Sequence, residues 1–264
     1  MKSLDLILTF ALLPAECLVA AIKAAMTREK KPMTVVLRHL LQMRNLQYLM
    51  PFYALGWAVL VLNFSPWLLL AVAWGCLLQF MFEYVLHRFA YHGTPPTDQS
   101  AFSKLYRTHI AHHEYPTDTR FFAGDAPWYG VRVSALVVGL HTLALWAFMG
   151  FGGALVAGTT ATFVGGISAY LFYEYCHTLA HLPVHKGRFG RWVTRTHLAH
   201  HFQDHHATFH VSAGMGWIDW VLGTAFDKQQ AKDRFDAETH ASLGMAKDDP
   251  RLVTARHELG LDRS

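Results

Sequence analysis

Two segments of this 264-residue chain, 48–87 and 133–177, contain no lysine or arginine and are almost entirely apolar. Within and just beside them, four stretches are long enough to cross a bilayer, since roughly 30 Å of hydrocarbon takes on the order of 20 helical residues. These stretches are about 48–64, 66–87, 131–149 and 153–175. Short turns join the first to the second and the third to the fourth. The sequence therefore predicts an all-α integral membrane protein with four transmembrane helices in two hairpins.

The basic residues all lie outside these two segments, which predicts an orientation. The chain is 52% hydrophobic and only 16% charged, yet it carries a formal net charge of +4. Because cytoplasmic loops are enriched in lysine and arginine, both termini and the loop 88–132 are expected on the cytoplasmic side. Topology thus explains the positive charge, and we expect a lipid bilayer and no nucleic acid as partner.

The flanks divide the chain into three regions. We expect residues 1–47 to form interfacial or cytoplasmic helices, with insertion of 3–20 left open, because 34–47 mixes basic and apolar residues. The core domain is 48–226, capped by a cytoplasmic helical part, and 227–264 is a cytoplasmic tail. The three cysteines are scattered at 17, 76 and 176 and predict neither a disulfide framework nor a cysteine-based zinc site.

Ten of the 18 histidines fall into four clusters with regular spacing. On an α-helix, positions i, i+3 and i+4 share a face, so HxxHH can direct three imidazoles to one point and HxxxH two. The clusters are "HRFAYH" (His87, His92), "HIAHH" (His109, His112, His113), "HTLAH" (His177, His181) and "HLAHH" (His197, His200, His201). Each spacing is typical of a metal site on a helix.

The first pair departs from this pattern, because His87 and His92 are five residues apart and do not share a face of a regular helix. Gly93 follows directly and favours an unwound end. Either the pair binds through a distorted last turn or its members serve different metals. By length, His87 and His177 both leave the membrane on the cytoplasmic side, so all four clusters are expected to meet there.

Ten imidazoles exceed the capacity of one ion, since zinc takes four ligands and iron up to six. Two ions with about five imidazoles each and open positions fit better. Neutral imidazole suits iron, zinc and copper alike, and an open two-metal site at a membrane boundary suits oxygen activation against a lipid C–H bond. His205 and His206 fall beyond the last motif, and we expect them not to be ligands.

These clusters, in this order and with these membrane spacers, resemble the fatty acid hydroxylase/sterol desaturase superfamily of membrane di-metal enzymes. The resemblance covers roughly 83–226, with "EYVLHRFAYH", "HIAHHEYPTDTRF", "YLFYEYCHTLAH", "PVHKG", "HLAHHF" and "WIDWVLGT". "HKG" and the Pro-Thr-Asp with Arg120 look most similar to fatty acid (sphingolipid) 2-hydroxylases. The resemblance implies a monooxygenase with two iron ions, the ten histidines as ligands and O2 as co-substrate, although a purified sample can also hold zinc.

The chain departs from that subfamily in three places. Leu182 replaces a histidine that usually ends the third cluster, and His210 stands where a glycine is usual, which puts substrate chemistry near it in doubt. A haem-binding cytochrome b5 motif is missing from this sequence. We therefore expect a separate electron donor of the ferredoxin or cytochrome b5 type, and a compact enzyme of the bacterial inner membrane.

Two carboxylates near the clusters, Glu174 and Asp219, are candidates for orienting a ligand histidine, although a hydrogen-bonded boundary carboxylate is an equal alternative. No catalytic residue beyond the metal ligands is predicted. His141 lies inside the third apolar stretch, where a neutral histidine bonded to a neighbouring helix is favoured over a functional one.

Three alternatives for function stay open. Within the same fold, the chain could be a sterol desaturase or oxidase, or a carotenoid or headgroup hydroxylase, because substrate choice depends on channel shape. A different class is a membrane zinc or iron transporter. Transport sites usually lie near the bilayer midplane, whereas these clusters lie at its edge, so a lipid-acyl hydroxylase is the leading hypothesis.

Overall fold

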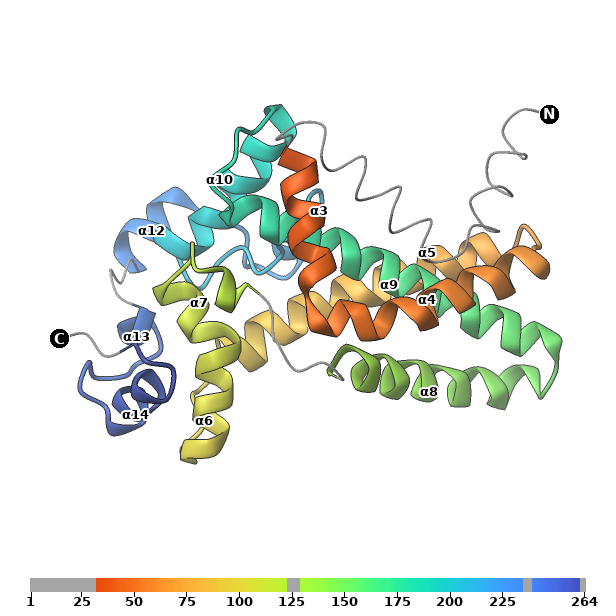
Figure 1. The fold of residues 1–264 in the computed structure, drawn as a ribbon, viewed down its shortest axis with the longest axis horizontal. Coiled ribbons are helices and arrows are strands. Elements are labelled where there is room, and N and C mark those ends of the chain that lie inside the picture. Colours follow the sequence, from red (N-terminus) through yellow and green to blue (C-terminus); the bar gives the residue numbers. More distant parts are fainter. Residues whose placement is uncertain (1–31, 123–128, 235–238, 262–264) are drawn as a thin grey trace.

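In the computed structural model, which describes residues 32–122, 129–234 and 239–261, every regular element is helical, as predicted. Figure 1 shows four long helices lying side by side and a group of shorter helices gathered at one end of them. The long helices are α4 (Arg44–Leu62), α5 (Leu68–Val85), α8 (Tyr129–Met149) and α9 (Gly153–His181). All four are long and apolar enough to cross a membrane. The predicted all-α membrane fold is confirmed.

The helix boundaries differ from the predicted ones at the end near the histidines. Helix α4 begins at Arg44, four residues earlier than expected, and α9 continues to His181, six residues further. The surface helix expected over 34–47 is instead α3 (Pro32–Gln42), and a break at Met43 separates it from α4. The membrane helices therefore extend beyond their apolar stretches and carry polar residues out of the bilayer. The segment 3–20 lies outside the described residues.

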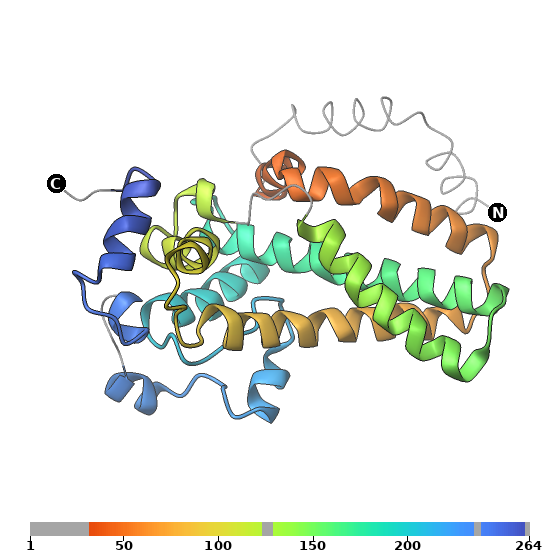
Figure 2. The same ribbon diagram turned by 90° about the horizontal axis from the view of Figure 1, so that it is seen from below.

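Helix α9 packs against each of the other three long helices and against α3 and α10, and Figure 2 shows it in the middle of the bundle. Its closest neighbour is α5. A Cβ atom on Gly75 would collide with the carbonyl oxygen of Thr162, and one on Gly165 with that of Val72. Since small residues let helix backbones approach closely in a membrane, these two glycines explain the tight pair.

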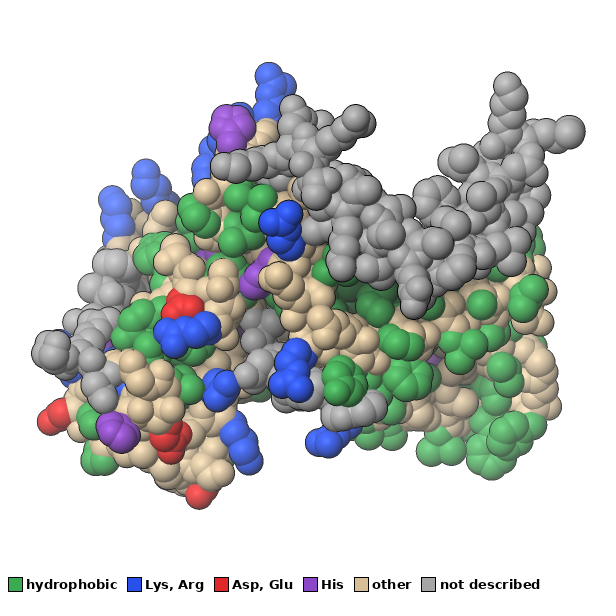
Figure 3. All heavy atoms as spheres, viewed as in Figure 1, with side chains coloured by type: hydrophobic (Ala, Val, Ile, Leu, Met, Phe, Trp, Pro, Cys, Tyr) green, Lys and Arg blue, Asp and Glu red, His purple; other side chains and the backbone are tan. Residues whose placement is uncertain are grey.

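The outer faces of the long helices are apolar. Leu62, Leu70 and Leu140 are 83%, 74% and 61% exposed, which suits contact with lipid and not with water. Figure 3 shows hydrophobic side chains spread over this half of the molecule, while lysine and arginine gather over the shorter helices. In α8, the His141 ring lies 3.5 Å from the Thr162 hydroxyl of α9, in line with the structural role favoured for it.

The shorter helices form the end that holds the histidines. They are η1 (Leu86–Tyr91), α6 (Gln99–Leu105), η2 (Tyr106–Ile110), α7 (Ala111–Glu114), η3 (Thr119–Phe121), α10 (Arg188–Phe202), α11 (Gly216–Val221), α12 (Lys228–Arg234), α13 (Thr239–Ser242) and α14 (Pro250–Glu258). Of these, η1 and η2 are π-helices and η3 is a 3-10 helix.

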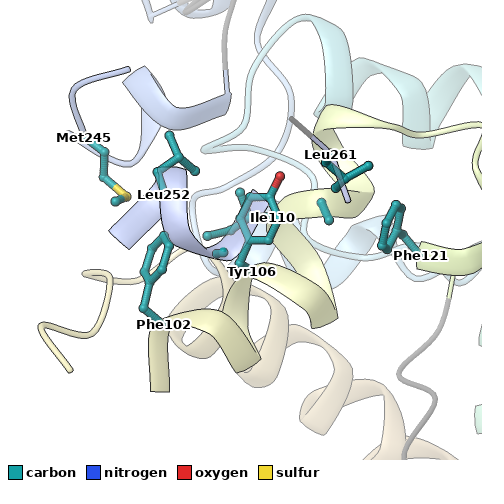
Figure 4. Packing of buried hydrophobic residues seen from close by; sticks show 9 residues of the cluster. Phe102, Tyr106, Ile110, Phe121, Met245, Leu252 and Leu261 are labelled. Atoms are coloured by element: carbon teal, nitrogen blue, oxygen red, sulfur yellow. The ribbon is translucent and has the colours of Figure 1, made fainter. Parts of the chain in front are cut away.

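A hydrophobic core ties α6 and η2 to the C-terminal residues. Figure 4 shows Phe102, Tyr106 and Ile110 packed against Leu252 of α14 and its neighbours. Arg256 of α14 pairs with Glu114 at the end of α7, and Tyr106 donates to the same carboxylate at 2.7 Å. The C-terminal residues therefore brace the segment that carries the second histidine cluster.

Candidate metal centre

All ten predicted histidines converge at the end of the bundle, and nine of them form two groups in which the ring nitrogens lie within 4.8 Å of one another. The first group is His87, His92, His109, His113 and His200, and the second is His112, His181, His197 and His201. His177 lies beside the second group, with its Nε2 atom 2.9 Å from Nε2 of His112. Helices α7 and α10 contribute to both groups.

A π-helix explains how His87 and His92, five residues apart, can face the same side. In η1 the backbone N–H of His92 donates to the carbonyl of His87 at 3.1 Å, an i to i+5 bond. The wider turn brings both rings to one side, so His87 and His92 belong to the same group. Of the two alternatives, the distorted last turn holds. A second π-helix, η2, carries His109.

The expectation that each HxxHH directs three imidazoles to one point is wrong. His109 and His113 belong to the first group and His112 to the second, whereas His197 and His201 belong to the second and His200 to the first. In both motifs the i, i+4 pair shares a group and the i+3 histidine points to the other. A helix turns by about 100° per residue, so i+3 and i+4 diverge enough to face two centres.

The spacing of the nitrogens fits bound metal. In the first group, Nε2 of His109 lies 2.8 Å from Nε2 of His92 and 3.0 Å from that of His113. In the second, Nε2 of His197 lies 2.7 Å from that of His181. Two imidazoles bound at roughly 2.1 Å on adjacent positions of one ion would be about 3.0 Å apart in octahedral and about 3.4 Å apart in tetrahedral geometry, so small movements would admit an ion to either group.

The electrostatic environment keeps these rings neutral. Burial lowers the pKa of His109, His113 and His200 well below its ordinary value, and the neighbouring imidazoles lower it further. The same causes act on His112, His197 and His201 in the second group. Neutral imidazole is the form that binds metal, so both groups are ready to accept a cation.

A buried loop, residues 207–212, orients two ligands of the first group. The carbonyl of Phe209 accepts from Nδ1 of His87 at 2.6 Å, and the carbonyl of Ala207 accepts from Nδ1 of His200 at 2.8 Å. Such bonds fix the tautomer and direct Nε2 toward the centre. The loop therefore acts on the first group through backbone oxygen atoms.

Asp219 and Glu83 bind successive backbone amides of this loop, Asp219 at residues 209 and 210 and Glu83 at residues 211 and 212. Asp219 accepts from the backbone N–H of Phe209 at 2.8 Å and from the Thr224 hydroxyl at 2.9 Å. Glu83 accepts from the backbone N–H of Val211 at 2.7 Å and from the Ser212 hydroxyl at 2.6 Å. The sequence leaves two equal alternatives for Asp219, direct orientation of a ligand histidine or a hydrogen-bonded boundary carboxylate. It acts on the ligands indirectly, through the loop.

Glu174 has a different environment from the one expected for a carboxylate that orients a ligand ring. It interacts with Tyr170, whose hydroxyl also accepts from Asn45 at 2.9 Å. Its Oε2 atom is buried without a hydrogen-bond partner among the described residues. Glu174 and His177 line the same cavity, of about 510 Å³, so Glu174 adds a polar atom to its wall.

Glu83 and His210 also support the site, although neither is among the site residues predicted from the sequence. Glu83 is a carboxylate inside a transmembrane stretch, four residues before His87, and an ionisable residue at that depth is itself a signal of function. His210 is buried between the Asp219 carboxylate, 3.2 Å from Nδ1, and the Phe80 carbonyl, 2.9 Å from Nε2. Burial alone would lower the pKa of His210, but the bond to Asp219 and the charge of Glu83 outweigh it and raise the pKa.

The two histidines just after the last motif lie outside both groups. His205 is buried against the ring of His113, with ring centroids 5.0 Å apart, and its Nε2 donates to the carbonyl of His201 at 2.9 Å. His206 is exposed. Residues 197–206 contain five histidines, of which three belong to the two groups. His205 packs against His113 of the first group.

A cavity of about 510 Å³ opens onto both groups. Its lining includes His87 and His109 of the first group, His112 and His197 of the second, and His177. Most of the remaining wall is apolar and comes from α4, α5, α8 and α9, with Leu49, Phe82, Val133 and Ile167 among the residues. The cavity therefore connects the two histidine groups with the membrane part of the molecule.

The fatty acid hydroxylase family model matches residues 72–224, more than half of the chain. The chain belongs to the fatty acid hydroxylase family. The matched region contains all ten histidines and the loop that orients two of them. It also contains α8, α9 and most of α5, so these helices and the histidine groups belong to one hydroxylase domain.

Three curated members of this family illustrate the likeness. The chain is 30% identical over 141 residues to fatty acid 2-hydroxylase of Homo sapiens and 32% identical over 158 residues to the ceramide very long chain fatty acid hydroxylase SCS7 of Saccharomyces cerevisiae. These matches cover 52% and 54% of this chain and 35% of each relative. A third, the Arabidopsis thaliana dihydroceramide fatty acyl 2-hydroxylase FAH2, is 28% identical over 160 residues, 60% of this chain and 62% of that protein.

One solved structure shares the hydroxylase fold. It is full-length scs7p, of which only the hydroxylase domain is visible, and it superposes with a TM-score of 0.54 at 23% identity. The superposition covers 68% of this chain and 64% of that chain. At this identity it supports the fold alone.

Proposed function

We propose that this protein is a membrane di-iron monooxygenase that hydroxylates the acyl chain of a lipid at the carbon next to the carboxyl group. The observation that carries the proposal is the cavity whose wall contains five of the ten histidines and whose remaining surface is mostly apolar. An acyl chain is the ligand that such a wall suits, because it buries apolar surface without leaving polar groups unpaired. The relatives named as 2-hydroxylases favour the carbon beside the carboxyl.

The ten histidines would hold the two metal ions. Their nitrogen donors suit iron, and zinc equally by ligand type, so the choice of iron rests on the kinship with hydroxylases. Two bound iron ions, with O2 and two electrons, would supply the oxidising power to insert one oxygen atom into a C–H bond. We propose an electron-transfer protein of the ferredoxin or cytochrome b5 type as the source of these electrons.

The chain's own residues bind the substrate and orient the ligands. Apolar side chains of α4, α5, α8 and α9 line the cavity and exclude water from the acyl chain. The carbonyls of Ala207 and Phe209 keep His200 and His87 directed inward. Glu174 and Tyr170 add polar groups to the cavity wall near His177.

For location, we propose a bacterial inner membrane with the histidine groups and both termini on the cytoplasmic side. The absence of lysine and arginine from 48–87 and 133–177, and their abundance around the histidine end, supports this orientation. The proposed substrate is then reached from the cytoplasmic leaflet.

The test is turnover under labelled oxygen. Protein loaded with iron in lipid nanodiscs, supplied with a reduced donor and ¹⁸O2, should convert an acyl substrate into a product that gains one ¹⁸O atom at the carbon beside the carboxyl. His200→Ala should reduce this product to background. A labelled product at another position, or a new double bond, would favour a sterol or carotenoid enzyme or a desaturase. Metal flux across proteoliposomes without any oxidised product would favour a transporter.

A further inference from the structure

Three basic side chains line the same cavity as the histidines. Lys104 comes from α6, Arg107 from η2 and Arg120 from η3. All three are exposed, in contrast to the buried histidines of the wall. Positive charge therefore lies where the cavity meets the surface, close to the predicted cytoplasmic edge of the bilayer.

Two described carboxylates of this region, Glu83 and Asp118, have partners of their own. Glu83 lines the cavity but holds the loop amides of Val211 and Ser212. Asp118 accepts from Nε and Nη2 of Arg120 at 3.0 and 2.6 Å. Arg120 is thus partly neutralised by Asp118.

Lys104 and Arg107 are placed to act together on one ligand. They are three residues apart, on either side of the junction between α6 and η2, and both line the cavity. Arg107 precedes His109, a member of the first histidine group, by two residues in the same π-helix. An anion held by this pair would have the adjoining carbon atoms near the histidines and its tail in the apolar part of the cavity.

We propose that Lys104 and Arg107, with Arg120 beside them, form a subsite for an anionic headgroup, a carboxylate or a phosphate, of the acyl substrate. The inference rests on the proposed acyl hydroxylase function and adds a selection by charge. Basic residues at a membrane edge also attract anionic lipid in general. Lys104 and Arg107 differ from such residues because they line the cavity, so their loss should change which ligand the cavity accepts.

The test compares two ligands that differ only in charge, the fluorescent polyene cis-parinaric acid and its methyl ester. Binding of each is measured in a non-ionic detergent, with the metal-loaded full chain. The wild type should bind the acid at least about tenfold more tightly than the ester, since one hydrogen bond to a charged group is worth about 1.5–3 kcal/mol, which is roughly tenfold to a hundredfold in affinity. The double variant Lys104→Gln/Arg107→Gln should lose this preference and bind the ester as before.

The matched control is Arg191→Gln/Arg195→Gln. It removes two exposed arginines of α10 that do not line this cavity, and it should keep the preference for the acid. Lys104→Arg/Arg107→Lys keeps the charges and should restore it, which excludes a folding defect as the cause. A double glutamine variant with the wild-type preference, or a control variant that loses it, overturns the subsite.

Competition identifies the anion. Palmitate and 1-palmitoyl lysophosphatidic acid share an acyl chain, and whichever displaces cis-parinaric acid at the lower concentration indicates a carboxylate or a phosphate. Because binding needs no turnover, it tests the subsite even if no product forms. Turnover of ester and acid at equal efficiency, unchanged in the double variant, would instead leave the hydroxylase intact and refute the selection by charge.

Discussion

The two histidine groups have similar ligands but different supports. In the first, two rings are oriented by carbonyls of the loop 207–212, which Asp219 and Glu83 hold in place. In the second, the Nδ1 atoms of His112, His197 and His201 are buried without a hydrogen-bond partner among the described residues, as is Nδ1 of His113 in the first, and only His181 bonds to a backbone carbonyl, that of Pro116. One group thus depends on a distant loop, and the other mainly on the packing of α7, α9 and α10. The metal affinities of the two groups should therefore respond differently to substitutions in their surroundings.

Removal of one ligand from each group gives the largest expected effect. His200→Ala should weaken metal binding in the first group and His197→Ala in the second, each lowering the metal content from two ions toward one, since each substitution removes a nitrogen donor. Both should abolish turnover. Metal analysis of the purified variants measures this, and loss of both metals in either variant would show that the groups do not bind independently.

Removal of the side chain that supports loop 207–212 should lower the metal affinity of the first group only, with all ten histidines unchanged. Asp219→Ala leaves the buried N–H of Phe209 without its acceptor, at a cost of about 1–3 kcal/mol. Loss of such outer partners typically weakens metal affinity about 10–100-fold. We expect this loss in the first group alone, measured by chelator competition.

Glu258→Ala, which removes an exposed carboxylate of α14, serves as the control for Asp219→Ala and should leave both affinities unchanged. Equal weakening of both groups by Asp219→Ala would contradict the difference in support.

A packing defect between α5 and α9 should lower the metal affinity of both groups to a similar extent. Gly165→Ala forces a methyl group against the backbone of Val72, and overpacking costs typically about 1–3 kcal/mol. Helix α5 leads to His87 and α9 carries His181, so thermal unfolding and both metal affinities should decline together. Gly139→Ala in α8 is the control, because a Cβ there meets nothing within 4 Å. A selective loss from one group would argue against a shared helical frame.

The smallest effect concerns pH. The pKa of His210 is raised in the folded protein, so its protonated form stabilises the loop fully below about pH 6.5, the ordinary value. That contribution should decline as the pH rises through the folded-state pKa. The difference in unfolding temperature between wild type and His210→Gln should therefore narrow from acidic to alkaline pH. A gap that stays constant across this range would mean that His210 acts in its neutral form.

The sequence predicted the features that depend on local pattern. Apolar stretches gave the four long helices, and histidine spacing selected the ten residues that converge. The π-helices were not predictable, because an i to i+5 bond leaves no distinct mark in residue type, and only the five-residue gap between His87 and His92 pointed to one. The division of each HxxHH between two groups depends on how α7 and α10 face each other, which is set by tertiary packing.

The support that Glu83 and Asp219 give to loop 207–212 could not be predicted from the sequence either. Glu83 and Asp219 are 136 positions apart, and nothing local shows that both bind the amides of one loop. Boundaries were least certain at the histidine end, where α9 continues beyond its apolar stretch because its last turns are buried by protein and not by lipid.

The alternating assignment of histidines in α10 has a consequence for how this chain can vary. His200 and His201 are adjacent yet face different groups, so their rotation of about 100° around the helix axis sets the direction of each centre. Replacement of Leu198 or Ala199 leaves that rotation intact. Insertion or deletion of one residue there would rotate the later histidines by about 100° and misplace ligands of both centres at once. Related chains should therefore differ in residue identity across this turn but never in its length.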